Sequence, residues 1–143
     1  AEKNKSSSNL ICSSLLHDYG HFVVKDPNQL VKDQIDGTHE IIGANYLKNF
    51  FSNEIIEPIL LHVEAKKYLA RNVKYFNSLT EASKVSLKLQ GGIMSDYEVE
   101  KFKQNKYYKN AIKLRRFDES AKKYMIKIKK IEDYKELLTS KII

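Results

Sequence analysis

The sequence Leu-Leu-His-Asp-Tyr-Gly-His (residues 15–21) places a His-Asp pair behind apolar residues, with a second histidine four positions after the first. Residues 6–19 carry apolar side chains at the three- and four-residue spacing of a helix, and Gly20 ends that pattern. We therefore expect His17 and Asp18 in the last turn of a first helix. Adjacent helical residues point about 100° apart. His17 can thus supply a nitrogen to one metal ion, and Asp18 an oxygen that bridges to a second.

The composition predicts an ordinary globular chain with a basic surface. Its 143 residues include 25 Lys and Arg and 18 Asp and Glu, a formal charge of +7. The lysines are not interleaved with stacking aromatic residues as in nucleic-acid-binding modules. The single cysteine, Cys12, excludes an intramolecular disulfide and suits a reducing compartment. The longest nearly apolar run, 55–63, is shorter than the roughly 20 residues of a membrane span. We expect a cytoplasmic protein that binds neither nucleic acid nor a membrane.

The apolar spacing along the rest of the chain predicts an all-α fold in one domain, residues 1–143. Helix 39–51 should bury Ile42, Tyr46 and Phe50, and Ser95 with Glu98 should form a capping box. Residues 124–143 form a basic amphipathic tail that could begin with a short strand at 125–129. The expected helices cover residues 6–19, 39–51, 54–72, 79–90, 95–104 and 106–123, with a loop at 22–37, a connector at 72–78, and caps at Asp36 or Thr38, Asn53 and Ser78.

Histidines are few, and each lies on a predicted helix end or face. Imidazole together with carboxylate suits iron, manganese, zinc or nickel rather than calcium. A histidine among apolar residues, as at position 62, either hydrogen-bonds in the core or faces a metal. Lys66 shares its helix face, and is either a surface lysine or a cation held beside the metal for an anionic group. The four histidines are His17, His21, His39 and His62.

Two further polar groups lie on predicted helices. Ser83, Ser86 and Gln90 share one stripe of helix 79–90 within an apolar surround. Arg115 and Asp118 are three residues apart, so they face one another on their helix. They form either a local ion pair or a carboxylate ligand next to a bidentate anion clamp.

Five pieces of the sequence resemble the HD superfamily of metal-dependent enzymes. The closer resemblance is to its oxygenase branch, the mixed-valence di-iron enzymes of the PhnZ type that cleave organophosphonates and are related to myo-inositol oxygenase. It runs from Leu15 to about Lys122 and implies an HD-domain helical bundle around a dinuclear metal site. The pieces are LLHDYGH (15–21), DGTHEIIGA (36–44), PILLHVEAKKYL (58–69), SLKLQGG (86–92) and LRRFD (114–118).

The resemblance implies that Asp18 bridges two iron ions, Fe(II) and Fe(III). His39 and His62 would complete one iron, and His17 and Asp118 would bind the other. The implied reaction uses O2 to cleave the carbon–phosphorus bond of a 1-hydroxy organophosphonate and release phosphate. Asp18, His21 and Lys66 would be the catalytic residues. The residues implied to line the phosphonate pocket are His21, Lys66, Ser83, Ser86, Gln90 and Arg115.

Two alternatives remain open. An HD-type phosphohydrolase would use Mn, Mg, Zn or Ni to activate water against a phosphate ester or nucleotide. A non-catalytic binding protein would keep the HD fold without competent metals. The family pattern also has a metal-binding histidine on a helix upstream of the His-Asp pair, and residues 1–16 contain no histidine. We therefore expect a partial chain that lacks its N-terminal helix. The sequence leaves the oligomeric state unknown.

Overall fold

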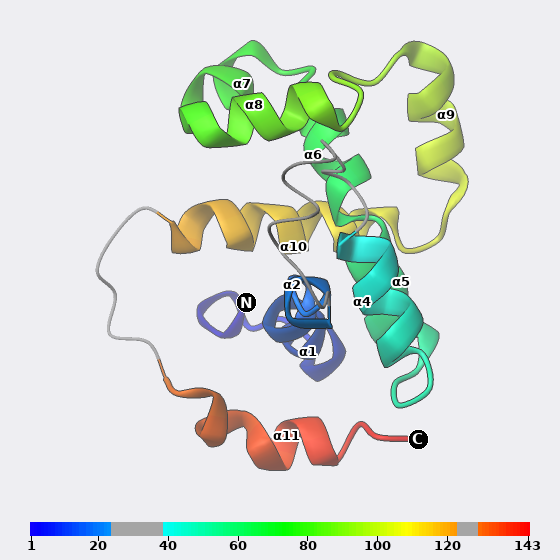
Figure 1. The fold of residues 1–143 in the computed structure, drawn as a ribbon, viewed down its shortest axis with the longest axis vertical. Coiled ribbons are helices and arrows are strands. Elements are labelled where there is room, and N and C mark those ends of the chain that lie inside the picture. Colours follow the sequence, from blue (N-terminus) through cyan, green and yellow to red (C-terminus); the bar gives the residue numbers. More distant parts are fainter. Residues whose placement is uncertain (24–38, 123–128) are drawn as a thin grey trace.

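The computed structural model describes residues 1–23, 39–122 and 129–143 (Figure 1). In these ranges the chain is helical, and its extended pairing is limited to one isolated bridge between Phe51 and Ile142. The predicted all-α fold is therefore confirmed. The helices are η1 (Glu2–Asn4), α1 (Ser8–Leu16), α2 (Gly20–Val23), α4 (His39–Leu47), α5 (Asn53–Leu60), α6 (His62–Leu69), α7 (Val73–Ser78), α8 (Glu81–Leu89), α9 (Asp96–Gln104), α10 (Tyr108–Ala121), η2 (Ile131–Tyr134) and α11 (Lys135–Thr139).

Helix α10 crosses the middle of the molecule, and the other elements are arranged around it. Helices α1, α5 and α6 pack against α10, while α4 packs against both α2 and α5. Helices α7, α8 and α9 lie on the opposite side of α10 from α1 and α2, and α11 lies beyond α1 (Figure 1). Cys12, Ile55 and Ile59 are fully buried where α1 meets α5. This core, to which Ala44 and Leu47 also belong, fixes α1, α4 and α5 relative to one another.

Of the expected helices, one ends early and another divides, each next to a histidine. Helix α1 ends at Leu16, so His17 and Asp18 lie in the turn before α2 and not in a last helical turn. The helix expected over 54–72 divides at Leu61 into α5 and α6. Near that break, Nδ1 of the His62 ring donates a hydrogen bond to the carbonyl oxygen of Ile59. A side chain inserted at a carbonyl competes with the helical ladder, which is a known cause of a helix break.

The capping residues explain where the elements near α8 begin. The connector expected at 72–78 is wrong, because Asn72 caps α7 by accepting a hydrogen bond from the Tyr75 amide. Thr80, and not Ser78, caps α8. The capping box predicted at Ser95 is confirmed, with its Glu98 partner in place. Ser52, and not Asn53, is the N-cap of α5.

The buried face of α4 differs from the expected one. Tyr46 and Phe50 are 46% and 41% exposed, whereas Gly43, Ala44 and Leu47 are buried. Gly43 lies against the backbone of Gly20, so small residues form the contact with α2 and the large rings are left at its edge.

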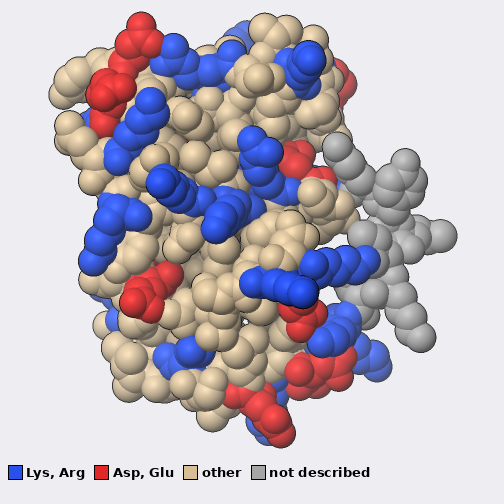
Figure 2. Space-filling view, turned by 180° about the vertical axis from the view of Figure 1, so that it is seen from behind, with Lys and Arg blue, Asp and Glu red and all other residues tan. Residues whose placement is uncertain are grey.

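Several expectations concern residues outside the described ranges. The caps Asp36 and Thr38 and most of the strand at 125–129 lie there, as does the loop expected at 22–37 apart from Phe22 and Val23, which are instead the last residues of α2. In the described part of the tail, η2 and α11 are present, and Leu137 and Leu138 pack on the core. Lys and Arg side chains are spread over the face in Figure 2 with acidic groups among them. No helix in the described part of the chain is long and apolar enough to cross a bilayer.

Candidate metal centre and anion pocket

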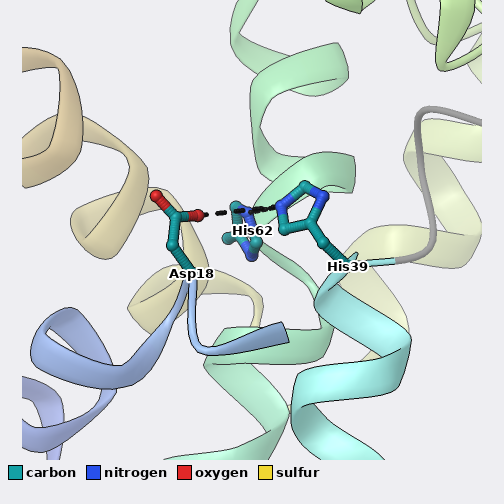
Figure 3. A group of neighbouring side chains, drawn as sticks. All are labelled: Asp18, His39 and His62. Carbon is teal, nitrogen blue, oxygen red and sulfur yellow. Dashed lines mark hydrogen bonds and ion pairs between the residues drawn. The ribbon is translucent and has the colours of Figure 1, made fainter. Parts of the chain in front are cut away.

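Asp18, His39 and His62 point toward one another from three separate elements (Figure 3). Asp18 lies in the turn after α1, and each histidine is the first residue of its helix, α4 or α6. His39 Nε2 lies 3.2 Å from His62 Nε2 and 3.7 Å from Asp18 Oδ1. Atoms bound at right angles to one ion, each at about 2.1 Å, lie about 3 Å apart. The three side chains are therefore spaced to hold one metal ion.

Backbone carbonyl groups fix the orientation of two histidine rings. His62 Nδ1 lies 2.7 Å from the carbonyl oxygen of Ile59, and His17 Nδ1 lies 3.0 Å from that of Ser14. A carbonyl oxygen only accepts, so Nδ1 carries the hydrogen in both rings. For the neutral ring this leaves a lone pair on Nε2, the nitrogen that faces the other candidate ligands.

A second group of donor atoms adjoins the first. His17 Nε2 lies 3.2 Å from Asp18 Oδ2 and 3.8 Å from Asp118 Oδ1. The two oxygens of Asp18 thus face different groups: Oδ1 faces His39 and Oδ2 faces His17. The rings of His17 and His62 meet edge to face, with centroids 5.3 Å apart. A carboxylate placed between two donor groups in this way is suited to bridging two metal ions.

The charge states follow from burial and from these contacts. Burial lowers the pKa of His17, but Asp118 and Asp18 outweigh it and raise that pKa to about 10. Burial, together with the neighbouring His17, lowers the pKa of His62 to about 3. Burial raises the pKa of Asp18, but His17 outweighs it and lowers that pKa to about 2. The pKa of Asp118 is also held well below its usual range, because His17 and Arg115 outweigh its burial.

Near neutral pH the group therefore holds two ionised carboxylates, a neutral His62 and a cationic His17. The carboxylates favour a positive charge between them, and the protonated ring supplies it. Imidazole nitrogens with carboxylate oxygens suit Fe, Mn, Zn or Ni. The donor set fits the metal-binding centre that the HD resemblance implies.

Metal binding is expected to release a proton from His17, because the metal ligand is the neutral ring. The pKa of about 10 keeps this ring protonated in the metal-free protein at neutral pH. Affinity at this position should rise about tenfold per pH unit between pH 6 and 8, with about one proton released. Calorimetric titration in buffers of different ionisation enthalpy measures that number. The His17→Gln variant should release about one proton fewer, and an affinity that is independent of pH would contradict the expectation.

The candidate ligands open into a pocket of about 400 Å³. Lys66 is buried in its wall and donates hydrogen bonds to Ser86 Oγ and, over 3.1 Å, to Gln90 Oε1. A cation is thus held one helical turn after the candidate ligand His62. The sequence-predicted site residues that line this pocket are Asp18, His21, His39, His62, Lys66, Ser83, Ser86, Gln90, Arg115 and Asp118. Of the predicted set, His17 alone is absent from the lining, and it lies against Asp18.

Two other pocket residues are held by short local contacts. The His21 ring stacks on the His39 ring, with centroids 4.3 Å apart and planes 13° apart. The buried Ser83 hydroxyl accepts a hydrogen bond from the Thr80 hydroxyl over 3.1 Å. His21 therefore stacks directly on a candidate ligand, while Ser83 is fixed by the cap of α8.

Arg115 forms the local ion pair that was one of its two expected roles. Its Nη1 donates to Asp118 Oδ2 over 2.6 Å, its Nη2 pairs with Glu119, and its Nε donates to the Tyr75 hydroxyl over 3.2 Å. The guanidinium thus holds Asp118 by Oδ2 and leaves Oδ1 toward His17. Its role as a substrate clamp stays a prediction.

Sequence reasoning missed several residues of this pocket. Thr80 and Lys122 line it, together with Val63 and Ala82. Lys122 follows Asp118 by four residues, and Thr80 precedes Ser83 by three, so helical spacing could have identified both. Glu40 lies outside the lining, with its Oε2 3.4 Å from His39 Nδ1. It directly follows His39 in the sequence, and only the fold shows that it is buried.

Comparison with known proteins identifies the family to which a chain with this geometry belongs. The HD-domain family model matches residues 1–127, which include every candidate ligand. The chain belongs to the HD-domain family. The observed helical bundle and the clustered His and Asp side chains of this HD domain agree with that match.

Three relatives resemble this HD domain over most of its length. Hydroxymethylphosphonate dioxygenase of Gimesia maris is 40% identical over 138 residues, 94% of this chain and 68% of the relative. A second is [1-hydroxy-2-(trimethylamino)ethyl]phosphonate dioxygenase (glycine-betaine-forming) of Leisingera caerulea, 43% identical over 86% of this chain and 63% of the relative. Uncharacterized protein L432 of Acanthamoeba polyphaga mimivirus is 32% identical over 96% of this chain and 64% of the relative. The chain thus spans about two thirds of the length of these relatives.

Proposed function

We propose that this chain forms the catalytic core of a di-iron oxygenase that cleaves the carbon–phosphorus bond of a 1-hydroxyphosphonate with O2. The observation that carries the proposal is the two-sided Asp18 carboxylate, with His39 facing one oxygen and His17 the other, in a pocket that Lys66, Arg115 and Lys122 also line. Two of the similar proteins are phosphonate dioxygenases by name, which supports the same reaction. We assign the function to a single domain over residues 1–143 and expect it in the cytoplasm.

The proposed reaction balances without a further reductant. A hydroxymethylphosphonate dianion and O2 give formate, hydrogen phosphate and one proton. The carbon–phosphorus bond breaks, the carbon is oxidised to a carboxylate, and O2 is reduced as its two oxygen atoms enter the products. A pair of iron ions held by His17, Asp18, His39, His62 and Asp118 would supply the O2 activation.

The remaining side chains would bind and orient the anion. Lys66 would pair with the phosphonate while Ser86 and Gln90 hold its amine in place, since a charge-assisted contact from a fixed donor is stronger than one from a mobile donor. Ser83 would add a hydroxyl to the same wall. His21 would border the substrate while its ring stays stacked on His39.

Oxygen-dependent phosphate release tests this function. The iron-loaded chain given hydroxymethylphosphonate should release phosphate and consume O2 in equal amounts, and release should stop without O2. The Lys66→Gln variant should keep its iron and lose roughly 10- to 100-fold in kcat/KM, because a charged contact to the phosphonate is removed. Phosphate release without O2, or turnover of a phosphate monoester without O2 uptake, would contradict the proposal and favour the hydrolase.

A further inference from the structure

The pocket is bordered by three cationic side chains that are held in different ways. Lys66 and Arg115 are buried, whereas the Lys122 side chain, at the C-cap of α10, is 41% exposed. A partly exposed lysine on a four-carbon stem can change its position with little cost. Lys122 is therefore the pocket cation least fixed by burial, although its Nζ also donates to Asp118 Oδ2.

Arg115 is already committed to groups of the chain. Its three nitrogens contact Tyr75, Asp118 and Glu119. Two carboxylates thus balance its charge, and moving the guanidinium would break contacts in a buried place. Arg115 accordingly acts as a positioning residue for Asp118.

Lys122 shares these same two carboxylates. Its Nζ lies 3.0 Å from Asp118 Oδ2, the oxygen that Arg115 also holds, and 3.9 Å from Glu119 Oε1. Asp118 is in addition a proposed metal ligand through its other oxygen. In the metal-loaded protein its negative charge would be divided among the metal, Arg115 and Lys122, so this side of the pocket would be positive.

The described lining offers nothing suited to a cationic substituent. Its carboxylates are Asp18 and Asp118, both proposed metal ligands, and its aromatic rings are the imidazoles of His21, His39 and His62. Sites for quaternary ammonium groups use the faces of Trp, Tyr or Phe rings, and the part of the pocket that the structure describes has none.

We propose that Lys122 makes this pocket select 1-hydroxyphosphonates whose carbon substituent is uncharged or anionic over those that carry an ammonium group. The inference rests on the proposed function and names its substrate class. A pocket of about 400 Å³ is comparable in width with a Debye length of about 8 Å, so a charge anywhere in it is within reach of Lys122. By their names, the two dioxygenase relatives differ in the charge of the substituent on their substrate's carbon, since one acts on hydroxymethylphosphonate and the other on a trimethylamino compound.

Three ligands separate charge from size. They are hydroxymethylphosphonate, 1-hydroxy-2-(trimethylamino)ethylphosphonate, and the neutral analogue of the latter in which carbon replaces the nitrogen. Dissociation constants from calorimetry on the iron-loaded protein without O2 give the selectivity ratio between the two bulky compounds. The unmodified protein should bind the neutral analogue roughly tenfold more tightly than the cationic one. Lys122→Gln should reduce that ratio by about threefold and Lys122→Glu by about tenfold or more.

Matched variants guard against indirect effects. Lys122→Arg keeps the charge and should keep the ratio. Lys113→Glu makes the same change in net charge at an exposed position of α10 outside this pocket, and should leave the ratio unchanged. Iron content must equal that of the unmodified protein, because Lys122 touches Asp118.

The outcomes distinguish the two proposals. A ratio that favours the cationic ligand, or that Lys122→Glu leaves unmoved, overturns the selectivity alone. Binding of the phosphonates without O2-dependent phosphate release overturns the proposed function, while the ratio still tests the selectivity. Failure of all three ligands to bind overturns both.

Discussion

Replacement of Gly20 by alanine is expected to destabilise the protein by about 3 kcal/mol and to disrupt the metal centre. A Cβ atom on Gly20 would lie 1.9 Å from the His39 carbonyl oxygen and 3.0 Å from the Gly43 amide nitrogen. Both neighbours are backbone atoms, so α2 and α4 would have to separate. His39 would then move away from Asp18, and metal affinity at their shared position should fall by at least about tenfold. Urea unfolding and elemental analysis measure the two effects.

Gly92 provides the control for the Gly20 variant. A Cβ atom there meets no atom within 4 Å, but the residue has a φ of 79°. Gly92→Ala should therefore cost about 1 kcal/mol from backbone strain and leave metal binding unchanged. If Gly20→Ala matched Gly92→Ala in both measurements, the close contact between α2 and α4 would not be what holds His39 in place.

Replacement of Asp18 by asparagine is expected to remove both metals. The amide keeps the shape of the side chain but loses the charge, and the proposed bridge uses both carboxylate oxygens, one toward His39 and one toward His17. Metal affinity at the two positions should fall by about 100-fold or more, and oxygenase activity with it. Metal content per chain after dialysis measures the loss, and retention of two irons would exclude the bridging role.

Asp118→Asn is the matched comparison for Asp18→Asn. Asp118 faces His17 and does not belong to the group formed by Asp18, His39 and His62. The Asp118→Asn variant should therefore lose the metal bound by His17 and keep the one bound by His39 and His62. If Asp118→Asn lost as much metal as Asp18→Asn, the metal position at His39 and His62 would depend on Asp118 as well.

Most of the fold could be predicted from the sequence because apolar periodicity is a local property. The helix breaks could not be predicted, since they depend on side chains that form hydrogen bonds with backbone carbonyl groups, as His62 does with Ile59. The buried face of α4 was also mispredicted. A large ring normally indicates a core position, but the tertiary contact through Gly43 overrode that preference.

The candidate site could be named in advance because its residues match family motifs. Which of them lie together depends on the fold, and all but His17 line one pocket. Lys122 belongs to no such motif, although its spacing of four residues from Asp118 could have pointed to it. The hydrogen bond from Arg115 to Tyr75 could not be predicted, because the Tyr75 hydroxyl comes from forty residues earlier in the chain.

The hydrogen bonds from His17 and His62 to main-chain carbonyls have a consequence for how this centre can vary. In many metal proteins a carboxylate side chain orients the ligand ring, and its replacement weakens the site. Here the acceptors are the carbonyl groups of Ser14 and Ile59, which every amino acid possesses. The orientation of both rings is thus independent of the side chains at positions 14 and 59. Relatives could therefore differ at position 14, or carry another core residue at the buried position 59, while keeping the same ring tautomers, provided the helix ends are preserved.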